Sequence, residues 1–200
     1  MTENPILLID FGSGLPLFSA NTPADYGFST TYQQRLVPTV EDGYFAFVNK
    51  VYKHYNDAWH TNATDHTGNQ DGYMFLVNAN FQPGQFYNGQ VDNLCIGLRY
   101  EFSVYLANLC QPSNRIDPNV LFEVRTADAD NTLLVSVETG LIPKTTSLTW
   151  DRYGLSFVAT SSSVNLLMIS NAPGGNGNDI VIDDIGLRVC PNEGNGFCPQ

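Results

Sequence analysis

Two adjacent carboxylates inside an apolar strand are the residues of this sequence most suited to holding a metal ion. Asp183 and Asp184 follow a loop rich in Gly and Asn, Gly174–Asn178, and lie within the apolar run Ile180–Val189. Burying a carboxylate is costly unless a partner compensates its charge, and Lys and Arg are scarce in this chain. Calcium is a suitable partner, because it takes about six to eight oxygen ligands from carboxylates and backbone carbonyls.

Five carboxylates are candidate ligands of a structural calcium ion: Asp10, Asp65, Asp71, Asp183 and Asp184. Side chains alternate along a strand, so we expect Asp183 and Asp184 to face opposite sides of a sheet, with Asp183 slightly favoured as a ligand. The alternative is that both accept hydrogen bonds from backbone amides or lie at the exposed end of a strand.

A second set of residues suits the binding of a hydroxyl-rich ligand. Sugars stack their apolar faces on aromatic rings and hydrogen-bond to Asn and Asp, and such residues occur together between residues 50 and 71. Trp59 is the best single candidate, and the alternative is that it packs over the end of the fold and anchors its loop. The loop around Asn176 can equally be a tight turn that needs positive φ. The candidate ligand contacts are Trp59, Tyr55, Tyr52, Asn62 and Asn176.

No pattern in the sequence predicts catalysis. There is no nucleophile elbow, phosphate-binding loop or dinucleotide fingerprint. The three histidines, His54, His60 and His66, lack the close spacing of a cupin-type metal site. Glycoside hydrolysis needs two carboxylates about 5 to 9 Å apart, and the sequence identifies no such pair. We therefore expect a protein that is not an enzyme.

Composition narrows the range of partners. The 200 residues include 9 Lys and Arg against 20 Asp and Glu, which gives a net charge of −11. Nucleic-acid binding needs a basic surface, and no apolar run approaches the roughly 18 residues of a membrane span. We therefore expect neither nucleic acid nor membrane insertion, while neutral ligands, cations and divalent metals suit the acidic surface. Four cysteines and few lysines favour a secreted or cell-surface location.

The four cysteines allow three disulfide pairings. Residues 98–109 predict an extended strand, which would place Cys95 and Cys110 some 30 Å or more apart. A disulfide needs Cα atoms within about 7 Å, so a Cys95–Cys110 bond is disfavoured. Cys190 or Cys198 could each reach one of them, or these two could close the short terminal loop together. Free thiols are the remaining alternative.

Hydrophobic periodicity predicts an all-β sandwich of two antiparallel sheets. Short apolar runs with a period of two recur along the chain, and turn residues separate them. In the run Tyr100–Ala107 one face is apolar and the other carries Glu101 and Ser103, so we expect core on one side and a wetter face on the other. About ten strands are expected: Pro5–Asp10, Gly43–Asn49, Tyr73–Asn78, Gln85–Val91, Leu98–Leu109, Val120–Thr126, Thr132–Glu138, Leu148–Val158, Val164–Ser170 and Ile180–Val189.

Two long segments, residues 12–40 and 50–71, are poor in strand signal. Long loops in a compact domain tend to be functional or ordered by a ligand, so either segment could shape a binding surface. The chain shows no linker and no repeat. This predicts a single domain over residues 1–190, followed by an irregular extension over residues 191–200.

Several segments stand in an order that resembles a known family. The Asp-Phe pair at residues 10–11, the Asp-His-Thr-Gly segment at 65–68 with Gly-Tyr-Met at 72–74, and the closing Asp-Asp-Ile at 183–185 resemble the MAM family of extracellular adhesion modules. The chain is still more similar to the MAM-like and carbohydrate-binding-module-like jelly-roll domains of large secreted surface proteins of Bacteroidetes. That closer similarity lies in Pro83–Tyr87, Leu94-Cys95, Tyr100–Ser103, Ala107–Leu109 and Asn171–Gly175.

The resemblance covers most of residues 8–190 and implies a jelly-roll β-sandwich, an extracellular setting, bound calcium or sodium, and a role in adhesion or glycan binding. In such folds the first and last strands are neighbours, so Asp10 would lie near Asp183 or Asp184. The family usually carries Glu after the Asp-Phe pair, whereas this chain has Gly12. Any metal ligand from that position would be lost or replaced by a backbone carbonyl.

We therefore expect an extracellular, non-catalytic binding module with a structural calcium ion, and a carbohydrate as its leading ligand. The alternatives are a protein–protein cell-adhesion module and a structural spacer of a surface protein. The expected partner is a glycan or a cell-surface protein.

Overall fold

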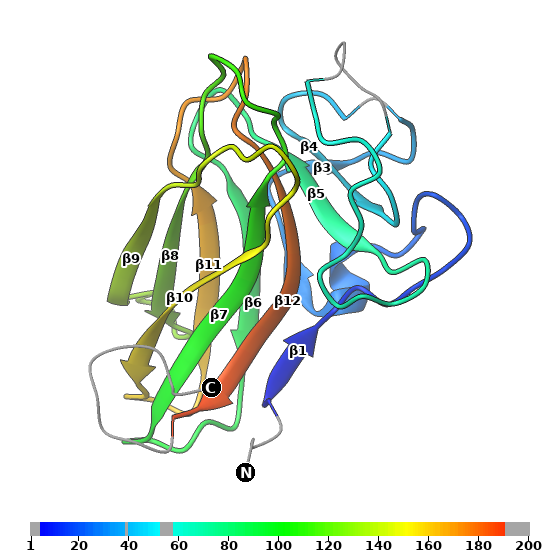
Figure 1. The fold of residues 1–200 in the computed structure, drawn as a ribbon. Coiled ribbons are helices and arrows are strands. Elements are labelled where there is room, and N and C mark those ends of the chain that lie inside the picture. The colour runs from blue at the N-terminus through cyan, green and yellow to red at the C-terminus, as the bar shows by residue number, and fades with distance from the viewer. Residues whose placement is uncertain (1–4, 39, 53–57, 191–200) are drawn as a thin grey trace.

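The computed structural model describes residues 5–38, 40–52 and 58–190, and in it two β-sheets pack face to face (Figure 1). These residues form twelve strands and one short 3-10 helix. None of their helical segments has the length and apolar character needed to cross a membrane. The elements are β1 Leu7–Ile9, η1 Pro23–Tyr26, β2 Phe28–Ser29, β3 Gln33–Gln34, β4 Tyr44–Val48, β5 Met74–Asn78, β6 Gln85–Val91, β7 Arg99–Asn108, β8 Asn119–Thr126, β9 Leu133–Leu141, β10 Asp151–Val158, β11 Val164–Ser170 and β12 Asp179–Val189.

The strands form a seven-stranded larger sheet and a five-stranded smaller sheet. The larger sheet has the order β10-β7-β12-β5-β4-β3, with β1 paired to β12, and the smaller has the order β2-β6-β11-β8-β9. Neighbouring strands are antiparallel except β3 and β4. The predicted all-β sandwich is confirmed, with twelve strands instead of ten because β2 and β3 have only two residues each and show no periodicity. The first and last strands are neighbours, with Ile9 opposite Ile185.

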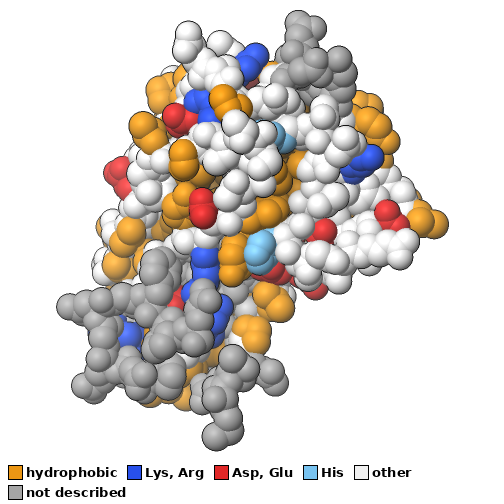
Figure 2. Space-filling view, in the orientation of Figure 1, with side chains coloured by type: hydrophobic (Ala, Val, Ile, Leu, Met, Phe, Trp, Pro, Cys, Tyr) orange, Lys and Arg blue, Asp and Glu red, His pale blue; other side chains and the backbone are white. Residues whose placement is uncertain are grey.

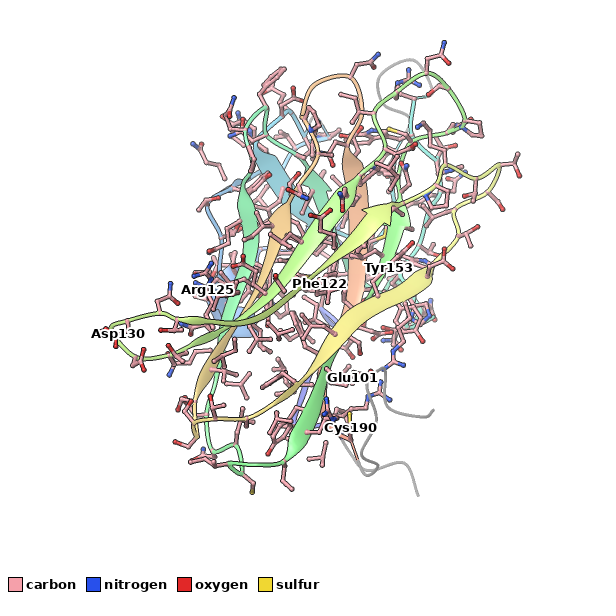
Figure 3. The ribbon with its side chains drawn as sticks, turned by 90° about the vertical axis from the view of Figure 1, so that its left-hand side faces the viewer. Glu101, Phe122, Arg125, Asp130, Tyr153 and Cys190 are labelled. Carbon is pink, nitrogen blue, oxygen red and sulfur yellow. The ribbon has the colours of Figure 1, made fainter. Side chains whose placement is uncertain are left out.

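The core between the sheets is built by alternation along the strands. In β7, the apolar face of Tyr100, Phe102, Val104 and Leu106 is buried there, as predicted. The ring centres of Phe102 and Phe122 lie 5.4 Å apart across the two sheets. Figure 3 shows the sheets edge-on, with Phe122 of β8 between them. Burial of these side chains supplies the main driving force for the sandwich.

The opposite face of β7 is also buried, so the prediction of a wetter face there is wrong for most of its residues. Glu101, Ser103 and Ala107 are each at most 3% exposed. The segment after β4 packs against Ala107, whereas Arg152 of β10 contacts Glu101 and Ser103. Figure 2 shows the same face, with hydrophobic side chains gathered along its middle. We call the cluster that forms there the outer cluster: Val40, Ala46, Val48, Val51, Ala58, Trp59, Ala63, Met74, Leu76, Ala107, Leu109, Cys110 and Val181.

On this outer face, two arginines compensate the charge of the buried Glu101 carboxylate. It forms ion pairs with Arg152 of β10 and, at 3.8 Å, with Arg188 of β12. Two like charges therefore flank one carboxylate at the end of the sheet near Cys190 (Figure 3). Removing either the acid or its bases would leave a charge buried without compensation.

The cysteines divide into free and bonded groups. Cys95 is an exposed free thiol and Cys110 a buried one, so the disfavoured bond between them is absent. Cys190 is disulfide-bonded. Cys198 lies outside the described residues, as does the whole extension 191–200, so closure of the terminal loop by Cys190 and Cys198 stays a prediction.

Candidate functional site

A pocket of about 490 Å³ opens at one end of the larger sheet. It lies where β4 and β12 begin and β5 ends, at the upper end of the molecule in Figure 1. The loops before β8 and before β12 form one wall and are tied together by the amide of Ile116, which donates to the carbonyl of Asn176 at 2.9 Å. We call this the sheet-end pocket, and its lining residues are Glu41, Asp42, Tyr44, Ala58, Trp59, Asn78, Arg115, Gly175, Asn176, Gly177 and Asp179.

Strand register places three polar side chains of the pocket in one row. Tyr44 of β4 is opposite Asn78 of β5, and Asn78 is opposite Asp179 of β12. The next row on the same face lies two residues away on each strand. It consists of Ala46, Leu76 and Val181, all in the outer cluster. Because residues two apart share a face, the row of polar side chains continues the outer face of the sheet where its apolar cover ends.

The carboxylate of Asp179 is the most unusual group in the pocket. It is 5% exposed, and its Oδ2 accepts hydrogen bonds from Trp59 Nε1 at 2.8 Å and from Cys110 Sγ at 3.1 Å. Its Oδ1 has no hydrogen-bond partner among the described residues. Burial, with a smaller contribution from the charge of Asp42, raises the pKa of Asp179 to about 6 against the opposing effects of these hydrogen bonds and of Arg115.

Asn78 presents a second unused acceptor beside Asp179. Its amide nitrogen donates to the carbonyl of Val40 at 2.8 Å, and its Oδ1, within the part of the chain that is described, meets no donor. Burial also raises the pKa of the neighbouring Asp42. A buried acceptor left without a donor costs about 1–3 kcal/mol, so the pocket floor is arranged for a group that donates hydrogen bonds.

Glycines allow the close approach of chains that forms the pocket wall. Gly177 has φ +116°, and a Cβ there would lie 2.5 Å from the carbonyl oxygen of Ile116. Asn178, with φ +62°, is 2% exposed and donates to Ser170 Oγ and to the carbonyl of Ala172, each at 2.9 Å. The Gly- and Asn-rich sequence therefore meets the need for positive φ and for close packing of chains in this loop. The same loop holds Asn176 at the pocket.

The structure brings together two of the five predicted ligand contacts. Asn176 is exposed and lines the pocket, and Trp59 lines it while being only 2% exposed. Trp59 is therefore not an exposed stacking platform. It anchors its loop through Asp179, which was the alternative considered for it.

The other predicted contacts lie outside the pocket. Tyr52 is 53% exposed and is not among the lining residues. Asn62 is exposed with φ +63°, and its amide donates to the carbonyl of Val51 at 2.9 Å. Tyr55 lies outside the described residues.

Several residues of the pocket were not predicted from the sequence. Asn78 ends the apolar strand β5, and Asp179 directly precedes the apolar run Ile180–Ile182 of β12. This signal could have marked both as groups at a sheet end. Asp42 lies in a turn and Arg115 in a bend, where charged residues are common and carry no such signal.

The Asp183 and Asp184 carboxylates bind the segment at residues 66–67 instead of facing opposite ways. Asp183 is fully buried. Its Oδ2 accepts from the amides of His66 at 2.8 Å and Thr67 at 3.1 Å, and its Oδ1 accepts from the amide of Asp184 at 2.9 Å. Asp184 Oδ2 lies 2.6 Å from His66 Nδ1, and Thr67 Oγ1 donates to Asp184 Oδ1 at 2.9 Å. The alternative of hydrogen bonding to backbone amides is thus realised for Asp183, whereas Asp184 contacts the side chains of His66 and Thr67.

A β-bulge explains why the expected alternation fails. The register between β12 and β7 shifts between Asp183 and Gly186, and Asp184 has φ +49°. Ile182 and Ile185 are three positions apart, so strict alternation would place them on opposite faces of the sheet. The extra residue of the bulge brings both into the inter-sheet core. Both carboxylates therefore reach the same loop.

The predicted calcium ligands do not form a calcium site by their side chains alone. Among the described residues, no three side chains of His, Cys, Asp or Glu converge as metal ligands. Asp10 Oδ1 accepts from the amide of Gly12 at 3.1 Å, Asp65 Oδ2 accepts from the amide of Asn69 at 3.2 Å, and Asp71 is exposed. Calcium also uses backbone carbonyls, so its binding stays a prediction.

The outer face of the smaller sheet is a second surface to consider. Glu123 and Arg125 of β8 form an ion pair there at 2.7 Å, and Asn88 and Asn165 lie on the neighbouring strands. The aromatic residues of the described strands of this sheet are all buried in the inter-sheet core: Phe28, Phe86, Tyr87 and Phe122. The strands of this face therefore offer no aromatic ring for a sugar to stack on, whereas the lining of the sheet-end pocket includes the partly exposed Tyr44.

No family model matches this sequence, and no curated protein matches it at a significant level. Among solved structures, the CBM22-1 xylan-binding domain of Paenibacillus barcinonensis Xyn10C aligns over 93% of this chain and 94% of that domain, with 11% identity and a TM-score of 0.51. The arabinose-bound α-L-arabinofuranosidase MgGH51 aligns over 92% of this chain and 26% of its own length, with 12% identity and a TM-score of 0.51.

The enzymatically active domain of tailspike protein 4 of bacteriophage CBA120 aligns over 82% of this chain, with 11% identity and a TM-score of 0.50. This chain spans only 19% of that protein. At sequence identities this low, the similarity shows a shared fold and does not show a shared function. The domain therefore has the jelly-roll β-sandwich fold that carbohydrate-binding modules adopt, and the resemblance to MAM-like modules stays a prediction.

Proposed function

We propose that this domain is a secreted or cell-surface carbohydrate-binding module, without catalytic activity, that holds a sugar in the sheet-end pocket. The observation that carries the proposal is the Oδ1 of the buried Asp179 in the pocket lining, which finds no hydrogen-bond partner in the described part of the chain. Two sugar hydroxyls would supply the missing donors, one to Asp179 Oδ1 and one to Asn78 Oδ1. The shared fold with a xylan-binding domain supports this proposal without identifying the sugar.

The size and rigidity of the pocket support a small ligand group. Its volume of about 490 Å³ lies within the roughly 300–1,000 Å³ of small-molecule sites. The guanidinium of Arg35 lies 3.9 Å from the ring centre of Tyr44, which holds that ring in place. Trp59 is fixed by its bond to Asp179. A pocket formed in advance lowers the cost of ordering groups on binding.

A glycan array, screened with the folded domain in calcium and again in chelator, tests this function. Each hit is then measured with two pocket variants, Asn176→Ala and Asp179→Asn, and with Asn88→Ala on the smaller sheet as the control. We expect the pocket variants to lose binding and the control to keep it. A blank array would contradict the proposal and favour protein adhesion or a spacer role, and loss of binding in Asn88→Ala alone would move the site to the sheet face.

We also infer that a structural calcium ion stabilises the domain near Asp183. The support is a fully buried carboxylate whose pKa burial raises to about 7, since a cation would compensate this charge. Calcium that binds only the native state raises the free energy of unfolding by about 2.7 kcal/mol at a hundredfold excess over Kd. Thermal melts with calcium and with chelator measure this, and identical melting temperatures would contradict it.

A further inference from the structure

At the buried floor of the pocket, three donors are used, while two side-chain acceptors of the described residues are not. Trp59 Nε1 donates to Asp179, Asn78 Nδ2 donates to Val40, and the amide of Gly177 donates to the carbonyl of Gly175 at 2.8 Å. Asp179 Oδ1 and Asn78 Oδ1 are both buried and, within the described chain, unpaired. A ligand group that only donates hydrogen bonds matches this floor better than one that also needs donors.

The charges of the pocket point the same way. The lining includes three acids, Glu41, Asp42 and Asp179, and one basic side chain among the described residues, Arg115. Glu41 is exposed and already paired with Arg35 at 3.4 Å, and Arg115 Nη1 donates to Ser113 at 3.0 Å. Among the described residues, Asp42 and Asp179 thus form no ion pair with a basic side chain, although the charge of Arg115 acts on Asp179. Burial raises the pKa of both carboxyls, because removal from water disfavours the charged form.

An ammonium group satisfies both conditions. It carries a positive charge and three donors with no acceptor, and its hydrogen bonds to carboxylates are roughly twice as strong as neutral ones. A hydroxyl in the same place donates only one hydrogen bond and brings no charge. An N-acetyl group would bring a carbonyl acceptor toward oxygens that cannot donate to it.

We propose that the sheet-end pocket selects an amino sugar, a hexosamine unit whose amine is free, and places its ammonium group between Asp179 Oδ1, Asn78 Oδ1 and the carboxylate of Asp42. This selectivity rests on the proposed sugar-binding function of the same pocket. The ring of the sugar lies against the wall formed by Tyr44 and Asn176, and its ammonium group points to the floor. Selection arises from one substituent of the sugar and not from the polymer backbone.

Three β-1,4-linked oligosaccharides of equal length test the proposal, because they differ only in the group at carbon 2. Oligomers of glucosamine carry an amine there, oligomers of N-acetylglucosamine an acetamide, and cello-oligosaccharides a hydroxyl. Affinities are measured by titration calorimetry with the full chain. We expect the glucosamine oligomer to bind at least tenfold more tightly than the other two.

Variants separate recognition in the pocket from general attraction to an acidic protein. Asp42→Asn and Asp179→Asn each remove one acid of the pocket, and Asp130→Asn removes one exposed acid at the tip of the β8–β9 hairpin (Figure 3). We expect the pocket variants to lose most of the tenfold preference and Asp130→Asn to keep it. Asp42 is only half-buried, so we expect Asp42→Asn to fold. It therefore tests the preference even if Asp179→Asn unfolds.

The outcomes distinguish this inference from the function on which it rests. If cello-oligosaccharides or acetylated oligomers bind as tightly as the glucosamine oligomer, and Asn176→Ala abolishes that binding, the amine preference is overturned while sugar binding in the pocket stands. If Asp130→Asn weakens binding as much as Asp42→Asn does, the attraction is general and the preference is overturned. If no sugar binds the folded domain, both proposals are overturned.

Discussion

The buried carboxylate of Asp183 should make the domain less stable as pH rises toward neutrality. Burial, followed by the charge of Asp184, raises its pKa from 3.8 to about 7. Because the native state then holds the proton more tightly than the unfolded chain, this contribution to stability is fully present below about pH 4 and is lost as pH rises to about 7. At about 1.36 kcal/mol per pKa unit, the loss is about 4 kcal/mol.

The variant Asp183→Asn removes the titration and keeps most of the local structure. Its amide oxygen can accept the hydrogen bonds from His66 and Thr67, while the acceptor for the amide of Asp184 is lost at a cost of about 1 kcal/mol. We expect the variant to be slightly less stable than the wild type at pH 4 and more stable at pH 8. Asp179, whose pKa of about 6 is also raised by burial, leaves a smaller slope of the same sign in the variant.

Urea unfolding of both proteins in chelator, at pH values from 4 to 8, measures these slopes. Equal slopes for the wild type and Asp183→Asn, or a wild-type stability that rises with pH, would refute the reasoning. Repeating the series with calcium gives a second comparison. A cation bound at Asp183 favours the ionised carboxylate, so it should flatten the wild-type curve and leave the variant unchanged.

Three further predictions concern side chains that the fold places in contrasting surroundings. Trp59→Ala should cost about 3–5 kcal/mol of unfolding free energy because the ring is buried, whereas Tyr52→Ala on the surface should change it by less than about 0.5 kcal/mol; equal losses in urea titrations would contradict this. Gly177→Ala should lower the melting temperature because of its positive φ and the contact with Ile116, and Gly186→Ala, which has room for a Cβ, should not. In a thiol-reagent assay of the native protein the exposed Cys95 should react, while Cys110, whose pKa burial raises further from neutrality, should react only after unfolding. Matching reaction rates of the two thiols would argue against that burial.

The sequence predicts the strands well because most of them bury one face and show a period of two. Gln85–Val91 and Val164–Ser170 match β6 and β11 residue for residue. The period of two fails where the outer face is covered as well. Ala107 packs in the outer cluster with Trp59, and Glu101 is buried in its ion pairs with Arg152 and Arg188. It also fails at Asp184, where a bulge with positive φ adds one residue to the strand.

The pocket is harder to predict than the fold because its residues meet only through strand register. Tyr44, Asn78 and Asp179 lie 34 and 101 positions apart in the sequence and become neighbours only once β4, β5 and β12 are aligned. For Trp59, the local sequence suggests an exposed binding residue, whereas the structure buries the ring. An aromatic ring among polar residues resembles an exposed platform, and only its bond to Asp179 shows that it is part of the wall.

The pairing of β1 with β12 determines how this domain could be displayed by a larger assembly. Leu7 lies opposite Leu187, so the chain enters and leaves the sandwich at the same end (Figure 1). The pocket begins at Asp179, at the other end of β12, about 30 Å away at roughly 3.3 Å per residue. A protein, bead or surface attached at the end where β1 begins and β12 ends would therefore leave the pocket pointing outward and unobstructed.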